Sequence, residues 1–245
     1  MCLLSCISGV FAGTIDPAIP DSKYIEYGSK FRCVGSLCGI YNDNQKFCAS
    51  AVAIDDKIIL TAAHVISNYK ECYITINGKK IKIINVIIEP EFTSEFGYHD
   101  IAIGLCEQSI DLDFYPLLYD KDDEIGKVCA IAGFGITGTF NTGSKINDHT
   151  KRAGSNIIDG IDRNLLICSP SGKGIKTELE FLIASGDSGG GLFIDNKLAG
   201  INSCVLAVDK KPDSTYGDES GHTRISIHKE WIVKSKQKLL ESNIK

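Results

Sequence analysis

Short apolar runs alternate with turn-forming residues through the first half of the chain. Between Phe31 and Leu118 there are six such runs, rich in Ile, Val and Ala, and no long segment with a helical period interrupts them. Asn77-Gly78 is a strong hairpin signal, because both residues tolerate the positive φ of a type I′ turn. The clearest runs are Ala51–Ile54, Lys57–Leu60, Cys72–Ile76 and Lys79–Ile88. This pattern predicts a closed antiparallel barrel, which leaves no sheet edge exposed.

The second half also reads as short strands and ends in one amphipathic segment. Strand-like runs cover 128–132, 164–168, 191–194, 197–201 and 223–225. Asn196 predicts a tight turn between two of them. After His228, a few apolar residues lie among Lys and Glu, which predicts a terminal helix over about 228–242 that packs back on the strands. A basic helix on a membrane surface is the alternative, although its apolar face would be small.

Two polar segments divide the chain. The run 119–124, Tyr-Asp-Lys-Asp-Asp-Glu, predicts a solvated linker with no binding role between an N-terminal unit of about 28–118 and a C-terminal unit of about 125–227. The segment 135–150 is rich in Gly, Thr and Asn and predicts a surface loop in the second unit.

Composition narrows the classes of partner. A chain of 245 residues that is 43% hydrophobic can bury a substantial core, and its 24 glycines favour strands and turns. A formal net charge of −5 offers no electrostatic footprint for nucleic acid or for an anionic membrane. We therefore expect polypeptide partners.

Candidate chemistry centres on Ser188 within the run Gly186–Gly191. A serine hydroxyl becomes a nucleophile only with a base in hydrogen-bond reach and with donors aimed at the developing oxyanion. Glycines around Ser188 leave the backbone free to adopt positive φ and leave its N–H groups accessible. His64, which follows a strand-like run, and Asp100, which precedes another, supply a base and a carboxylate.

The order His64, Asp100, Ser188 resembles that of the trypsin/chymotrypsin-like serine proteases. The resemblance extends from Phe47 to Trp231. Its motifs are Phe47–Val52, Thr61–His64, His99–Ile103, Gly133–Gly135, Gly186–Gly190, Gly200–Ser203 and Thr223–Ile225. It implies an all-β fold of two packed antiparallel six-stranded β-barrels, chymotrypsin-like, with a C-terminal α-helix. It also implies a serine endopeptidase.

By this resemblance Ser188 attacks the scissile carbonyl, His64 transfers the proton and Asp100 fixes the His64 tautomer. The N–H groups of Gly186 and Ser188 would form the oxyanion hole. Asp187 is expected to be a structural anchor beside the nucleophile and not a member of the triad.

The remaining histidines call for another interpretation. His99 could be mistaken for the base, but on an extended segment it would face away from the side that Asp100 faces. His222 and His228 are expected to be structural or surface residues, and His149 lies in the predicted loop.

The resemblance also places a substrate pocket. Leu182, six positions before Ser188, would form the floor, and Ser203 and Val205 would belong to the wall. An apolar floor cannot hold an unpaired Lys or Arg charge, so we predict cleavage after small or medium apolar residues. Two alternatives stay open: Glu180 could reach the pocket if the loop register differs, and His222 could favour an acidic residue.

The N-terminal region allows several interpretations. Residues 1–12 are apolar and end in Val-Phe-Ala, which could precede a signal-peptidase cut before Gly13, but no basic residue precedes Lys23. An arm packed on the fold is the alternative. We divide the chain into a leader or pro-segment, 1–23, and a peptidase domain, 24–245. Family members are activated by a new N-terminus that pairs with the residue matching Asp187, and cleavage after Lys23 is the matching hypothesis here.

The cysteine count favours an oxidising compartment and a secreted or periplasmic protein. There are ten cysteines, and eight remain if Cys2 and Cys6 leave with a leader. Cysteines that usually form disulfides in the family are absent here, since Val65, Ile194 and Ala184 occupy their positions. Either new pairs form, with Cys38 and Cys48 as a possible hairpin bridge, or most thiols are buried as small hydrophobes.

Other functions are less well supported. A noncatalytic protease-like binding module is the main alternative. It is favoured because the family's activating N-terminal sequence and its usual disulfides are missing, but the complete triad argues against it. An esterase of another fold fails on the triad order. No metal cluster and no phosphate-binding loop is evident, so we expect no cofactor and no metal. We expect a monomer that takes polypeptide substrates, with a proteinaceous inhibitor as a further partner, and no nucleic acid or membrane partner.

Overall fold

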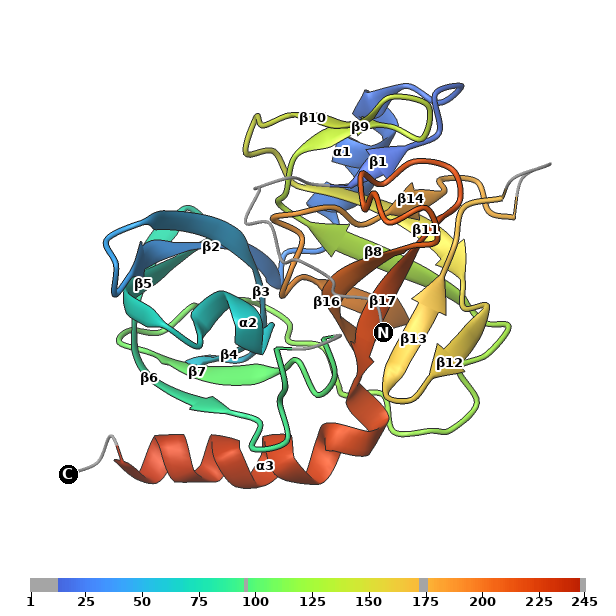
Figure 1. The fold of residues 1–245 in the computed structure, drawn as a ribbon. Coiled ribbons are helices and arrows are strands. Elements are labelled where there is room, and N and C mark those ends of the chain that lie inside the picture. Colours follow the sequence, from blue (N-terminus) through green and yellow to red (C-terminus); the bar gives the residue numbers. More distant parts are fainter. Residues whose placement is uncertain (1–12, 95–96, 172–175, 243–245) are drawn as a thin grey trace.

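A computed structural model describes residues 13–94, 97–171 and 176–242. Six strands of the first half close into a barrel in the order β2-β3-β4-β7-β6-β5 (Figure 1). They are β2 (Val34–Tyr41), β3 (Lys46–Asp55), β4 (Ile58–Thr61), β5 (Tyr69–Ile76), β6 (Lys79–Ile88) and β7 (Ala102–Cys106), with the short helix α2 (Ala63–Ile66) after β4. The predicted closed barrel is thus confirmed.

The strands of the second half, with β1 from the N-terminal segment, form a seven-stranded sheet and a smaller four-stranded sheet. The first has the order β11-β8-β15-β16-β17-β13-β12, from β8 (Val128–Gly133), β11 (Arg152–Ile157), β12 (Gly160–Asp162), β13 (Leu165–Cys168), β15 (Gly191–Ile194), β16 (Lys197–Ala207) and β17 (Asp218–Arg224). The second has the order β10-β9-β1-β14, from β1 (Thr14–Ile15), β9 (Thr137–Thr139), β10 (Gly143–Ile146) and β14 (Phe181–Leu182). All pairings are antiparallel except that of β1 with β9.

Two hairpins have the turns that their sequences require. Asn77 and Gly78, between β5 and β6, both have positive φ, at 50° and 74°. Asp195 and Asn196, between β15 and β16, have φ of 48° and 61°. A positive φ at both central residues defines the type I′ turn, which matches the twist of antiparallel strands. Both hairpins therefore have the turn that the sequence pattern predicted.

The terminal helix α3 (Ile225–Ser242) leaves the second half and runs along the first barrel (Figure 1). Its residues Ile225, Ile232 and Leu239 are almost fully buried in the same apolar cluster as the barrel interior. The predicted helix begins three residues earlier than expected. Its apolar face is occupied by the barrel, as the packing interpretation required. No described helix is long and apolar enough to cross a membrane.

The segment before the first barrel belongs to the fold. Residues 1–12, the apolar part of the expected leader, lie outside the described residues. From residue 13 onward the expected leader contributes β1 to the four-stranded sheet and opens α1 (Asp21–Ser29). Tyr24 of α1 is fully buried, and the Arg152 guanidinium, 3% exposed, binds the carboxylates of Asp21 and Asp148. A cut after Lys23 would therefore fall inside a packed helix.

The polar run 119–124 is not a purely solvated linker. Glu124 has no exposed surface and accepts hydrogen bonds from Arg224 Nε at 2.7 Å and Nη2 at 2.8 Å. These bonds hold the pKa of Glu124 below its ordinary value even though burial raises it. The connection between the halves is thus fixed to the strand that precedes α3.

One disulfide is found among the described residues, and it is the predicted hairpin bridge between Cys38 on β2 and Cys48 on β3. Five further described cysteines are buried thiols outside any disulfide, namely Cys33, Cys72, Cys106, Cys129 and Cys168, and Cys204 is half-buried. Both of the alternatives expected for the cysteines therefore occur in one chain. Cys2 and Cys6 lie outside the described residues.

Candidate active site

The pairing of β4 with β7 brings His64 and Asp100 together. Thr61 is opposite Ala102 in this pair, so α2 begins beside the segment that carries Asp100. Nδ1 of His64 lies 2.7 Å from Oδ2 of Asp100, and the backbone N–H of His64 donates to Oδ1 at 2.8 Å. Because an ionised carboxylate only accepts, Nδ1 carries the proton and Nε2 is the free basic nitrogen.

Burial and pairing together set the charges of these two groups. Asp100 is fully buried, whereas 41% of the His64 side chain is exposed. Burial raises the pKa of Asp100, but the bonds from His64 and Ser203 outweigh it, and the pKa is lowered. Removal from water lowers the pKa of His64, but the Asp100 carboxylate outweighs this, and the pKa is raised. Asp100 is therefore ionised near neutral pH, next to a basic imidazole.

The second half supplies two further bonds to Asp100. The hydroxyl of Ser203 donates to Oδ2 at 2.6 Å, and that of Thr223 donates to the backbone oxygen at 3.1 Å. Ser203, expected in the substrate wall, thus directs its hydroxyl to the buried carboxylate. Asp100 belongs to the first half of the chain but is held partly by strands of the second.

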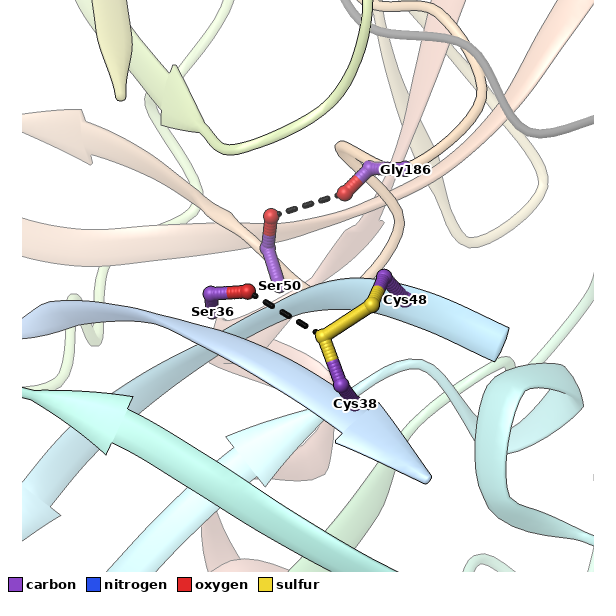
Figure 2. The surroundings of a disulfide bond; sticks show 5 residues. All are labelled: Ser36, Cys38, Cys48, Ser50 and Gly186. Carbon is purple, nitrogen blue, oxygen red and sulfur yellow. Dashed lines mark hydrogen bonds between the residues drawn. A yellow bond between two sulfur atoms is a disulfide. The ribbon is translucent and has the colours of Figure 1, made fainter. Parts of the chain in front are cut away.

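Ser188 lies in a tight loop whose carbonyls are held by Ser50 of β3. Gly186 and Gly189 on either side have φ of 92° and 85°, which a glycine adopts without strain. The backbone N–H of Ser50 donates to the Ser188 oxygen at 2.9 Å, and the Ser50 hydroxyl donates to the Gly186 oxygen at 2.8 Å (Figure 2). That hydroxyl also accepts from the N–H of Phe134 at 2.9 Å.

The backbone N–H groups of residues 186–190, here called the nucleophile loop, fall into two sets. Those of Asp187, Gly189 and Gly190 donate to backbone oxygens at 3.1, 2.8 and 2.8 Å. Those of Gly186 and Ser188 have no acceptor among the described residues. Likewise, no hydrogen bond joins Ser188 Oγ to His64 Nε2 within the described chain, and Ser188 is half-buried. Such catalytic contacts are often long without substrate and shorten when it binds.

The Asp187 side chain has other hydrogen-bond partners than Asp100. Its carboxylate accepts from the N–H groups of Gly135 at 3.2 Å, of Ala184 at 3.1 Å and of Gly13. The residue is 1% exposed, and burial raises its pKa to about 6 despite these three bonds. A buried carboxylate with only amide partners is costly to ionise. The Asp187 carboxylate is therefore bonded to backbone amides, whereas the Asp100 carboxylate is bonded to His64.

The expected pocket residues lie on β14 and β16. Leu182 is fully buried and is paired with Thr14, and Val205 is half-buried opposite Ser220. Glu180, 3% exposed, accepts hydrogen bonds from Ser171 and from the Lys176 N–H, the latter at 3.0 Å.

The other histidines occupy three kinds of environment. His222 is fully buried with Nδ1 2.9 Å from Asn202 Oδ1, and burial lowers its pKa to about 3. His149 is exposed on the predicted loop. His99 is in a turn and not on an extended strand, and its ring contacts His228 of α3, while Asp100 contacts His64.

Sequence reasoning missed three features of this site: the Ser50 hydroxyl, the amide of Gly13 on Asp187, and the contact between His99 and His228. Ser50 belongs to the motif Phe47–Val52, and its hydroxyl was the one feature of the sequence that could have indicated a contact with the site. The other two join segments far apart along the chain. Among the described residues, no group of three or more His, Cys, Asp or Glu side chains is arranged to hold a metal ion.

Comparison with known proteins identifies the family. The sequence pattern of the family described as Trypsin matches residues 29–232. The chain belongs to the trypsin family. The match includes His64, Asp100 and Ser188, and its start within α1 leaves the first strand, β1, outside it. The chain is thus a member of a serine protease family.

Two curated relatives of the trypsin family are similar at low identity. The chymase of Macaca fascicularis is 26% identical over 222 residues, which is 84% of this chain and 80% of the chymase. The chymase of Papio hamadryas is 25% identical over the same shares.

Solved structures of trypsin-family proteins share the fold. HL collagenase superposes with a TM-score of 0.71 at 17% identity, over 84% of this chain and 94% of that one. Mouse neuropsin gives 0.67 at 20% identity, over 91% and 98%. An inactivated protease paralogue of the scabies mite gives 0.63 at 16% identity, over 84% and 95%. These likenesses establish the chymotrypsin-like fold.

Proposed function

We propose that this trypsin-family protein is a serine endopeptidase that uses Ser188, His64 and Asp100. One observation carries the proposal: a buried, ionised Asp100 holds Nδ1 of His64 at 2.7 Å and leaves the basic Nε2 free on a partly exposed ring. A general base needs this tautomer and a pKa near the working pH.

The reaction follows from these charges. Ser188 Oγ attacks the carbonyl carbon of the scissile bond while its proton moves to His64 Nε2. The imidazolium formed is stabilised by Asp100, which does not itself take the proton. His64 then donates the proton to the leaving amine as the peptide C–N bond breaks. Water next attacks the acyl carbon and gives a proton to His64 Nε2, which passes it to Ser188 Oγ as the ester bond breaks and the acid leaves.

The oxyanion is stabilised, in this proposal, by the N–H groups of Gly186 and Ser188. They are the two amides of the loop without an acceptor among the described residues, while the amides of their neighbours are bonded. Preorganised donors of this kind contribute about 2.7–4 kcal/mol each to transition-state stabilisation. The Gly186 and Ser188 carbonyls, both held by Ser50, keep the loop in this shape.

We further propose that the mature chain begins at Gly13 and not at Tyr24. Gly13 is buried, and its N–H donates to the Asp187 carboxylate. A free ammonium at Gly13 would supply the cation that this buried carboxylate lacks, as the activating N-terminus does in the family. The removed leader is then 1–12, and the remaining segment before Tyr24 is part of the peptidase domain. Export to an oxidising compartment accompanies this proposal, in line with the Cys38–Cys48 bridge.

The pocket is proposed to accept small or medium apolar side chains. Leu182 and Ile183 are 0% and 2% exposed and present no carboxylate for a basic residue. Glu180 is occupied by Ser171 and Lys176, which argues against its reaching the pocket. His222, with a pKa of about 3, stays neutral and would not attract an acidic residue.

Labelling with a serine-directed fluorophosphonate tests the proposed function. The chain beginning at Gly13 should react, and the Ser188→Ala and His64→Ala variants should not. An equally folded wild-type chain that neither reacts nor hydrolyses a mixed peptide library would refute the proposal. That result would favour a noncatalytic binding module instead.

A further inference from the structure

Two histidines behind the proposed triad are hydrogen-bonded to each other. Nδ1 of His99 lies 3.0 Å from Nε2 of His228, and the rings meet edge to face at 73°. His228 is 4% exposed and lies in the first turns of α3. His99 is the residue immediately before Asp100. The pair therefore joins the terminal helix to the segment that carries the catalytic carboxylate.

The backbone at His99 makes a sharp turn. Its φ is 53°, in the left-handed region that Gly, Asn, Asp and His adopt more readily than other residues. The N–H of Ile101 donates to the His99 oxygen at 2.8 Å, which closes a tight turn around Asp100. The bond to His228, at 3.0 Å, is shorter than the 3.8 Å approach of Nε2 to Glu91, and it ties the ring of His99 to α3.

The carbonyl of Arg224 fixes the protons of the pair. His228 Nδ1 lies 2.7 Å from this oxygen, which can only accept, so Nδ1 carries the proton. In a neutral ring Nε2 of His228 is then the acceptor, and Nδ1 of His99 must donate to it. Burial lowers the pKa of His228, which keeps its ring neutral. Both bonds can therefore exist together.

The charged side chains near the pair lie beside His99. Nε2 of His99 lies 3.8 Å from Glu91, and Glu89 and Arg163 are the other charged side chains close to it. The two ring nitrogens of His99 thus face separate partners, Nδ1 the His228 ring and Nε2 the Glu91 carboxylate.

We propose that His228 is a positioning residue that acts through His99 to hold Asp100 against His64. The inference rests on the proposed hydrolysis and adds to it an anchor in the terminal helix. His228 touches neither substrate nor the reacting atoms. Its loss should let the turn at His99 relax and move Asp100 away from Nδ1 of His64. Because Asp100 raises the pKa of His64, this movement lowers that pKa.

The first test does not depend on activity. NMR titration of the His64 ring, in the Ser188→Ala chain to prevent self-cleavage, should show a pKa about one unit lower with His228→Phe. His228→Gln, whose side-chain oxygen can replace Nε2 as the acceptor, should keep the original pKa. His149→Phe is the matched control, since His149 also has a positive φ of 54° but is exposed on a loop, and should change nothing.

The second test uses hydrolysis. His228→Phe should lower kcat by about tenfold with KM changed by less than about twofold, and the acid limb of kcat/KM should move to lower pH. A loss of stability alone would not move that limb. If His228→Phe does not fold, His99→Gly removes the same bond while accepting the left-handed backbone, and the same shift is expected.

The outcomes separate the two proposals. An unchanged His64 pKa in folded His228→Phe or His99→Gly chains overturns the positioning role. Equal effects of His228→Phe and His228→Gln on that pKa overturn it as well. A wild-type chain without hydrolysis refutes the proposed function only, because the titration still reports whether His228 holds Asp100.

Discussion

The hydroxyl of Ser50 donates to the carbonyl oxygen of Gly186 at 2.8 Å, from β3 of the first barrel to the nucleophile loop of the second half (Figure 2). The backbone N–H of the same serine holds the Ser188 oxygen. The two residues whose N–H groups we propose for the oxyanion hole are therefore fixed, through their carbonyls, by one fully buried residue. The hole is shaped jointly by the two halves.

Ser50→Ala should lower kcat by about 10- to 100-fold and leave KM nearly unchanged. Its loss frees the Gly186 carbonyl and weakens the placement of one oxyanion donor, which costs less than removing a donor outright. Ser50→Thr keeps the hydroxyl and should retain most of the activity. Ser36→Ala is the matched control, because Ser36 is opposite Ser50 in the β2–β3 pair and its hydroxyl is paired with the sulfur of Cys38 (Figure 2). A rise in KM as large as the fall in kcat would contradict a role of Ser50 in placing an oxyanion donor.

Asp100→Asn should lower kcat by about 10⁴-fold, the loss that this change causes in trypsin-type enzymes. The amide would donate to Nδ1 of His64 and leave the wrong nitrogen protonated, so Nε2 could no longer take the Ser188 proton. In the wild type, kcat/KM should fall in acid with a midpoint above the ordinary histidine pKa near 6.5, because Asp100 raises the pKa of His64. A variant with wild-type kcat would remove Asp100 from the triad.

The stability of the chain should depend on pH in opposite ways before and after release of Gly13. In the longer chain the pKa of Asp187 is raised to about 6, so the folded state binds the proton more tightly than the unfolded state. That contribution, about 3 kcal/mol for two pKa units, is present below about pH 4 and is lost as the pH rises to 6. In a chain beginning at Gly13 the ammonium lowers the pKa, and the contribution is instead lost as the pH falls.

Urea unfolding of both chains at pH 4 and pH 7, each with Ser188→Ala, measures this difference. All other titrating groups from residue 13 onward are common to the two chains, so the contrast isolates Asp187 and Gly13. Asp187→Asn should abolish it. Parallel pH profiles for the two chains would rule out the mature N-terminus that we propose.

A panel of peptides that differ only in the residue before the cut tests the pocket. Ala, Val and Leu should be turned over at least about tenfold faster than Lys or Arg, since an unpaired cation beside Leu182 would be costly to bury. Leu182→Asp should shift the preference towards Lys and Arg by supplying the missing charge. Preferred cleavage after Lys or Arg in the unmodified chain would disprove the apolar pocket.

Local patterns predicted most of the strands, and they also suggested the close approach of His64 and Asp100. Asn77-Gly78 and the run before His64 needed only neighbouring residues to be interpreted, and the terminal helix followed from its apolar spacing. Contacts between distant segments were not predictable in this way. Ser50 and Gly186 are 136 positions apart, and His99 and His228 are 129 apart. No periodicity relates such residues, because the packing of whole barrels brings them together.

The Cys38–Cys48 bridge spans a single hairpin and closes a loop with a sequence separation of only 10. Hydrogen bonds from Ser50, Ser203 and Thr223 join the two halves around the site, and none of them involves a cysteine. Opening the bridge would loosen one edge of the first barrel but leave those contacts in place. The catalytic geometry should therefore outlast exposure to a thiol reductant, which sets this chain apart from enzymes whose active sites depend on covalent cross-links.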